Sequence, residues 1–298
     1  MQADFKSFAG IARAPFLLLP PTLVASGAAA AAWDGSFSWP RTLLAAVGLV
    51  ALHMAVNIFN EWSDLRTGID LHTDRTPFSG GSGTLPAGGM STRTAFSFGV
   101  ICSAVGLAIG LFFIRQVGWP LVPILLAGAI AVIAYTNVLA RIGIGELAAG
   151  FGLGAGPVIG AALVQSGEWS HAAAWTAVPA FLMTFNLLLL NEFPDEAADR
   201  EGGRRNLVIL MGRKRAALVY AAAALCAPAA IVLGVATGAL PLPCLVALAP
   251  SLMLAKPLRW AFSDPEAPVS IPALGANVIW NLATNTLLAV GLTVATVY

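Results

Sequence analysis

The sequence predicts an all-α integral membrane protein with about nine transmembrane helices in one bundle. Hydrophobic residues make up 58% of the 298 residues and charged residues only 10%, whereas soluble domains carry about a quarter of their residues charged. The mean hydropathy is +0.80. Runs such as LVPILLAGAIAVIAY are apolar on every face, which excludes the alternating pattern of a transmembrane β-barrel.

Apolar stretches between charges and Pro/Gly breaks predict the individual helices, because a membrane-spanning helix needs roughly 20 residues. The expected spans are 14–33, 41–62, 94–114, 119–137, 145–165, 172–192, 214–237, 240–257 and 273–297. Short loops join most of them. We expect residues 1–298 to form a single domain, with longer cap loops at about 63–93 and 193–213.

Lysine and arginine predict the orientation, because they concentrate in cytoplasmic loops. With a cytoplasmic N-terminus, only Arg41 and Arg115 of the 16 Lys and Arg residues fall on the far side. Both cap loops are therefore expected to face the cytoplasm. The net charge of +1 gives no indication of nucleic-acid binding, and the three cysteines lack the spacing of a metal site or disulfide framework.

The second and sixth predicted helices end in oxygen-bearing side chains that share one helical face. At the end of the sixth helix, oxygen-bearing side chains recur every four positions and therefore share one face. They are Asn191, Asp195 and Asp199. The second helix carries a similar series in His53, Asn57, Asn60 and Asp64, followed by Asp70 and Asp74. Ionisable residues at a membrane indicate function by default. The alternative is that one such series merely forms a solvated helix end without a function. Two series facing the same compartment make this alternative less plausible.

The residue types in these series indicate a metal–phosphate ligand. Carboxylate and amide oxygens suit Mg²⁺, which typically takes one or two carboxylates together with phosphate oxygens and water. Arginines close to the same helix ends are suited to the remaining phosphate oxygens. The combination predicts a diphosphate held by Mg²⁺ and guanidinium groups.

The two series also resemble a known family. The pattern N-x-x-x-D-x-x-x-G-x-D from Asn60 to Asp70, with N-x-x-x-D-x-x-x-D-R from Asn191 to Arg200, resembles the aspartate-rich motifs of the UbiA superfamily of intramembrane prenyltransferases. That family has nine helices and carries its motifs after helices two and six. Features similar to its 1,4-dihydroxy-2-naphthoate polyprenyltransferase (menaquinone) branch are NIFNEWSDLRTGID, Tyr135-Thr136, Gly143-x-Gly145-Glu146 and Arg13-x-Pro15. Positions that depart from that branch are Glu61, Glu192, Pro194, Arg204 and Asn206.

The resemblance implies a central cavity in which a polyprenyl group passes from a polyprenyl diphosphate to an aromatic acceptor, with Mg²⁺ as cofactor. It implies quinone, menaquinone-like biosynthesis at the cytoplasmic face of a bacterial inner membrane. The expected metal ligands are Asn60, Asp64, Asp70, Asn191, Asp195 and Asp199, with Asp64, Asp195 and Asp199 as the catalytic residues. Diphosphate binding is expected of Arg13, Arg75, Arg141 and Arg204, and His53, Asn57 and Tyr135 are expected to line the cavity.

Several alternatives stay open at this point. Within the family, the acceptor could belong to the ubiquinone, haem, chlorophyll or lipid branches. A membrane transporter is the rival from another class, but the acids cluster at helix ends and no inverted repeat is visible. A CDP-alcohol phosphotransferase would need a D-G-x-x-A-R motif, which is absent. The glycine-rich stretch 75–89 could close over the site or be merely a mobile loop.

Overall fold

The computed structural model describes residues 4–73 and 75–297, so that Asp74 lies outside the described residues. Within those ranges, eight helices are long and apolar enough to cross a membrane, and the shorter apolar segment Trp119–Ala134 makes a ninth element. The predicted all-α architecture with about nine spans is therefore confirmed.

The long elements follow the predicted order. They are η1–α2 (Ala14–Leu18 and Leu19–Trp33), α3 (Trp39–Thr67), α5 (Thr92–Val117), η2–α6 (Trp119–Leu121 and Val122–Ala134), α7–η4–α8 (Gly145–Gly150, Phe151–Ala155 and Gly156–Ser166), α9 (His171–Glu201), α11 (Arg213–Ala236), η5–α12 (Leu242–Leu254 and Ala255–Ser263) and α13 (Ile271–Val297). Four short elements complete the chain: α1 (Phe5–Ile11), α4 (Ile69–His72), η3 (Leu139–Arg141) and α10 (Leu207–Met211).

Both motif-bearing helices extend further than the sequence predicts. α3 continues to Thr67 and α9 to Glu201, so the cap loops are shorter than 63–93 and 193–213. Apolarity marks where contact with lipid ends, but it does not mark where the hydrogen-bonded helix ends. α9 continues through Pro194, and the segment EAADRE after it, residues 196–201, is rich in good helix formers. Both aspartate series therefore lie on rigid helices.

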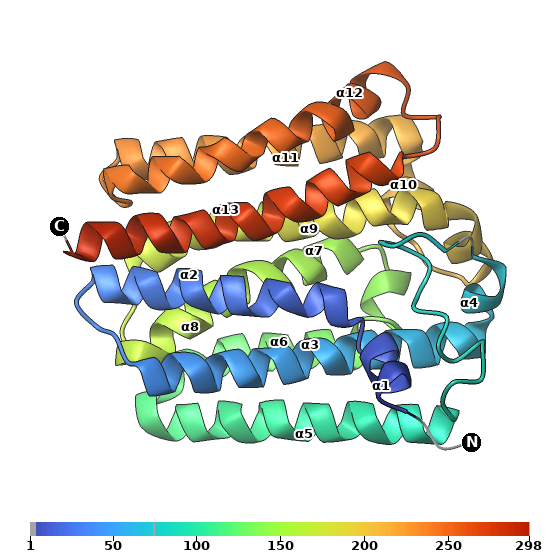
Figure 1. Ribbon diagram of the computed structural model, residues 1–298, viewed down its shortest axis with the longest axis horizontal. Coiled ribbons are helices and arrows are strands. Elements are labelled where there is room, and N and C mark those ends of the chain that lie inside the picture. The colour runs from blue at the N-terminus through green and yellow to red at the C-terminus, as the bar shows by residue number, and fades with distance from the viewer. Residues whose placement is uncertain (1–3, 74, 298) are drawn as a thin grey trace.

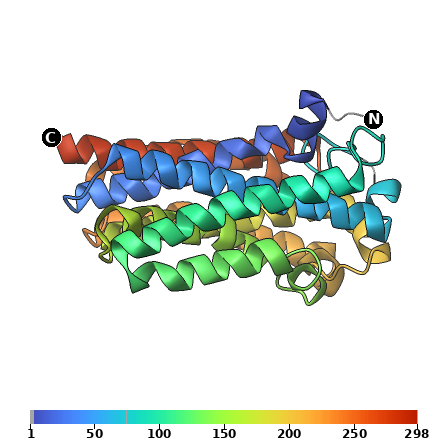
Figure 2. The ribbon, with the colours of Figure 1, turned by 90° about the horizontal axis from the view of Figure 1, so that it is seen from below.

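The long helices run side by side along one axis of the molecule (Figure 1). α1, α4, α10 and the loop that follows α4 gather at one end of the bundle, and the C-terminus lies at the other (Figures 1 and 2). The motif-bearing ends of α3 and α9 lie at the end that carries these short elements. One end of the bundle thus carries both aspartate series.

Small residues and buried amides hold the bundle together. A Cβ on Gly27 of α2 would lie only 2.2 Å from the carbonyl oxygen of Val158 in α8, a close approach typical of membrane helix packing. In α13, the Asn277 carboxamide oxygen accepts a hydrogen bond from the Tyr220 hydroxyl at 3.0 Å, and its nitrogen donates to the Asn186 carbonyl oxygen at 3.2 Å. Asn277 therefore links three helices.

Candidate active site

The two aspartate series meet through one arginine. Arg204 lies in the loop after α9, and its Nη2 donates to both carboxylate oxygens of Asp64 at 2.5 and 2.7 Å. Its Nη1 donates to Asp199 Oδ1 at 2.9 Å. The Asp64 and Asp199 side chains are only 5% and 2% exposed. Asp64 and Asp199, from the two separate aspartate series, are therefore close enough to share a single guanidinium group.

The loop after α4 is tied to both helix ends. Thr73 Oγ1 donates to Asp195 Oδ1 at 3.1 Å, and the backbone N–H of Gly80 donates to Asp195 Oδ2 at 3.1 Å. On the other side, the backbone N–H and hydroxyl of Ser82 donate to Glu61 of α3 at 2.7 and 2.5 Å. The glycine-rich stretch therefore covers the site as an ordered strap, hydrogen-bonded to α3 and α9.

Gly81 shows why this strap needs glycine. Its φ of +74° is a left-handed conformation that other residues adopt at a cost. A Cβ at this position would also lie 2.7 Å from Asp70 Oδ1. The backbone thus passes close against Asp70, a position that no side chain could share.

Beneath the strap lies a polar pocket of about 90 Å³. All six predicted metal ligands line it: Asn60, Asp64, Asp70, Asn191, Asp195 and Asp199. Of the predicted diphosphate-binding arginines, Arg13 and Arg204 line the pocket. Arg75 lies outside its lining and donates to the Asp70 carbonyl oxygen at 2.6 Å. Arg141 also lies outside, beside Gly203 in the loop that carries Arg204.

The donor set of this pocket fits a hard divalent cation. Burial, together with the nearby carboxylates of Asp64 and Glu61, raises the pKa of Asp70 to about 7. One buried oxygen of Asp70 has no hydrogen-bond partner among the described residues, so a nearby cation would stabilise the ionised form. Over those residues, no three His, Cys, Asp or Glu side chains converge on one ion position. A metal held here would therefore need amide or phosphate oxygens as well, which is the usual coordination of Mg²⁺.

Arg13 adopts an uncommon backbone conformation at the rim of this pocket. Its φ is +52°, the only positive value for a non-glycine residue in the described ranges. Two contacts from α3 hold it: Asn57 Nδ2 donates to the Ala12 carbonyl oxygen at 2.9 Å, and Arg13 Nε donates to Glu61 Oε1 at 3.0 Å. Strain of this kind persists where surrounding structure fixes it, and it clusters at functional sites.

Several residues of the site are not among those predicted from the sequence. Glu61 is fully buried and joins Arg13 to the strap. Asn206 donates to Asp199 Oδ2 at 2.9 Å. Both positions differ from the pattern of the resembling branch, and that departure was the available signal. The hydrogen bonds from Thr73 and Ser82 had no signal in the sequence, because they depend on how the strap folds back.

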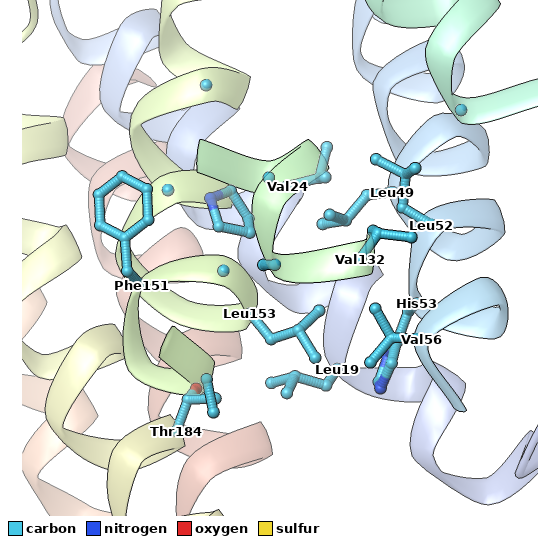
Figure 3. A pocket seen from close by; sticks show the side chains of 18 of the residues that line it. Leu19, Val24, Leu49, Leu52, His53, Val56, Val132, Phe151, Leu153 and Thr184 are labelled. Atoms are coloured by element: carbon cyan, nitrogen blue, oxygen red, sulfur yellow. The ribbon is translucent and has the colours of Figure 1, made fainter. Parts of the chain in front are cut away.

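A second, apolar cavity of about 280 Å³ adjoins the polar pocket. Six residues line both: Arg13, Asn60, Phe78, Tyr135, Leu188 and Asn191. The apolar cavity runs between α3, α5, α6 and the α7–α8 segment, and Figure 3 shows Leu49, Leu52, Val132 and Leu153 among its walls. The predicted cavity residues His53, Asn57 and Tyr135 all line it. The Nδ1 atom of His53 is buried without a hydrogen-bond partner among the described residues.

The family of this chain is identified by comparison with known proteins. Residues 18–271 match the model of the UbiA prenyltransferase family. The chain belongs to that family. It is therefore an integral membrane protein of a family of prenyl-group transferases.

Similar proteins in this family are known by sequence and by structure. Over 174 residues the chain is 27% identical to the 1,4-dihydroxy-2-naphthoate octaprenyltransferase of Bacillus subtilis (strain 168), a match spanning 57% of this chain and 55% of the relative. The fold resembles that of a UbiA homologue from Aeropyrum pernix K1, with a TM-score of 0.71, 20% identity, and coverage of 94% and 98% of the two chains. It also resembles a UbiA homologue from Archaeoglobus fulgidus bound to GPP and Mg²⁺, with a TM-score of 0.69, 13% identity, and coverage of 97% and 99%.

Proposed function

We propose that this protein transfers a polyprenyl group from a polyprenyl diphosphate to an aromatic acceptor, with Mg²⁺ as cofactor. The observation that carries this proposal is the pair of adjoining cavities. An acidic pocket with two arginines opens directly onto an apolar cavity. A polyprenyl diphosphate has the matching shape, with a charged head and an apolar tail. The A. fulgidus homologue bound to GPP and Mg²⁺ has this fold, which supports the assignment.

Different residues of the polar pocket would stabilise the leaving diphosphate in different ways. When bound by the oxygens of Asn60, Asp64, Asp70, Asn191, Asp195 and Asp199, Mg²⁺ supplies the positive charge that stabilises a leaving diphosphate. Arg204 and Arg13, which line the pocket, would donate hydrogen bonds to the remaining phosphate oxygens. The glycine-rich strap, residues 75–89, covers the pocket and limits the access of water.

The chemistry that follows takes place where the two cavities meet. Heterolysis of the allylic C–O bond leaves its electron pair on the diphosphate and an allylic cation at the end of the chain. The acceptor ring supplies the electron pair for the new C–C bond and then loses one proton to a base. The apolar cavity keeps water from the cation, and the ring of Tyr135, which lines both cavities, can stabilise it.

The acceptor and the cellular setting are part of the same proposal. The match to an enzyme named for 1,4-dihydroxy-2-naphthoate supports a hydroxylated aromatic acceptor of quinone biosynthesis, most closely the menaquinone branch. By the positive-inside rule, the end of the bundle that carries the site faces the cytoplasm. The match to a bacterial enzyme supports assigning the protein to a bacterial cell membrane.

The test combines purified protein in lipid nanodiscs, Mg²⁺, labelled geranylgeranyl diphosphate and a panel of acceptors. The panel contains 1,4-dihydroxy-2-naphthoate, 4-hydroxybenzoate, a porphyrin and a glycerol phosphate lipid, and mass spectrometry identifies the product. We expect prenylated naphthoate that disappears with EDTA and in both Asp64→Ala and Asp195→Ala. Arg200→Ala is the matched control, because Arg200 is largely exposed and, among the described residues, pairs only with Glu196.

Each result assigns or excludes a branch. Prenylation of 4-hydroxybenzoate, the porphyrin or the lipid alone would replace the menaquinone assignment by that branch. Normal turnover by both aspartate variants would refute the metal assignment. Solute uptake into proteoliposomes, without turnover of any prenyl diphosphate, would favour a transporter.

A further inference from the structure

The apolar cavity reaches deep into the bundle, and its far end is lined by buried side chains. On α3 its lining extends from Asn60 to Ala45, and 15 helical residues at 1.5 Å each span about 22 Å. At the far end it is lined by Phe113, Leu121 and Val164, which are all buried and belong to one hydrophobic cluster. A tail that enters from the polar pocket therefore follows a cavity of limited length.

The α6 helix forms a single-layer wall of this cavity. Residues on one face line the cavity: Leu121, Ile124, Leu125, Gly128, Ala131, Val132 and Tyr135. Residues on the other face are exposed on the outside of the bundle, with Leu126 at 59%, Ile130 at 56% and Ile133 at 77%. A side chain on the inner face of α6 therefore projects into the cavity, and one on the outer face meets lipid.

Gly128 differs from the other cavity-lining glycines of the described chain. A Cβ on Gly106 would meet Leu52 at 2.5 Å, and one on Gly110 would meet Leu125 at 3.0 Å. Those glycines are explained by helix packing. A Cβ on Gly128 would meet no atom within 4 Å, so packing does not require glycine there. The absent side chain keeps part of the cavity open.

We propose that Gly128 sets the length of prenyl chain that the cavity accepts. Gly128 lies seven residues before Tyr135, which lines the polar pocket, so it stands about 10 Å deeper along α6. An isoprene unit lengthens a chain by four carbon–carbon bonds of about 1.5 Å each, or roughly 5 Å after bond angles. A bulky residue at position 128 would thus leave room for about two units.

The proposal rests on the proposed function, because it concerns the tail of the same donor. The experiment measures Mg²⁺-dependent binding of geranyl diphosphate (two units) and geranylgeranyl diphosphate (four units) to the protein in nanodiscs. Wild type is compared with Gly128→Ala, Gly128→Leu and Ala129→Leu. Ala129 is exposed on the outer face of the same helix, so Ala129→Leu adds the same side chain without filling the cavity.

We expect Gly128→Leu to weaken binding of geranylgeranyl diphosphate by about tenfold or more, in line with the cost of overfilling a packed interior. Its binding of geranyl diphosphate should stay within about twofold of wild type, which also shows that the variant is folded. Gly128→Ala should have an intermediate effect, and Ala129→Leu none.

The other outcomes overturn the proposal in distinguishable ways. Equal binding of both donors by Gly128→Leu and wild type would show that the tail does not pass Gly128. Equal loss of both donors would show a general disturbance of the site, and would likewise refute a role in chain length. If wild type binds neither donor, the proposed function itself fails and this inference fails with it.

Discussion

Replacing Arg204 by glutamine tests whether its guanidinium is the counter-ion that allows the two acidic helix ends to meet. Arg204 makes three hydrogen bonds to Asp64 and Asp199, whose side chains are at most 5% exposed. Removing one partner of a buried ion pair costs about 3–5 kcal/mol. Because glutamine keeps some hydrogen-bonding capacity, we expect a loss in the free energy of unfolding of about 3 kcal/mol.

Thermal unfolding of detergent-solubilised protein in EDTA measures this loss. At about 2–4 °C per kcal/mol for a chain of this size, the midpoint should fall by about 6–12 °C. The control is Arg200→Gln, because Arg200 pairs with Glu196 at 2.9 Å but its side chain is 58% exposed. Such a pair contributes about 0.5 kcal/mol or less, so its midpoint should fall by no more than about 2 °C.

Added Mg²⁺ should distinguish the two variants further. In Arg204→Gln the carboxylates of Asp64 and Asp199 lack their cation, so Mg²⁺ should raise the midpoint more than it does in wild type. Equal midpoints for Arg204→Gln and Arg200→Gln in EDTA would refute the reasoning. So would a Mg²⁺ response in Arg204→Gln that does not exceed that of wild type.

Three further predictions concern the strap and the cavity. Gly81→Ala should destabilise the strap by about 1–3 kcal/mol, because a left-handed residue gains a Cβ against Asp70. Limited proteolysis within residues 75–89 should therefore become faster. The control for the effect of φ alone is Gly35→Ala, because Gly35 lies at an open turn. Glu61→Gln should weaken donor binding by about tenfold, because the charge that holds Arg13 is lost; unchanged geranyl diphosphate binding would contradict this. Gly128→Ala should raise thermal stability by about 0.5–1 kcal/mol, because alanine favours the helix and its Cβ meets nothing; a lower midpoint would show that the position is packed.

The sequence predicted the helices and both acidic series because those features are local. The length of an apolar run predicts a span, and the four-residue spacing of Asn191, Asp195 and Asp199 places them on one face. Both signals depend only on neighbours in the chain. The structure confirms the fold, and it brings all six expected metal ligands to one pocket.

The contacts between distant segments could not be predicted in the same way. Arg204 was expected near a diphosphate, but its bridge between Asp64 and Asp199 depends on the register of α3 against α9. Arg75 and Arg141 are also expected to bind the diphosphate, yet neither lines the polar pocket. Glu61 looks like a variant aspartate in the motif. Its longer side chain instead reaches both Arg13 and Ser82.

The acidic side chains of the site come from helices, and its basic side chains come from connecting segments. Four aspartates line the polar pocket, from α3, α4 and α9, while its two arginines come from the turn before η1 and from the loop after α9. A diphosphate entering this pocket meets more carboxylates than guanidinium groups, and the low dielectric of the bundle strengthens that repulsion. Under the proposed function, divalent cations would therefore accompany the donor. Because Arg204 lies in the loop after α9, we expect it to exchange the aspartates for phosphate oxygens while both helices stay in place.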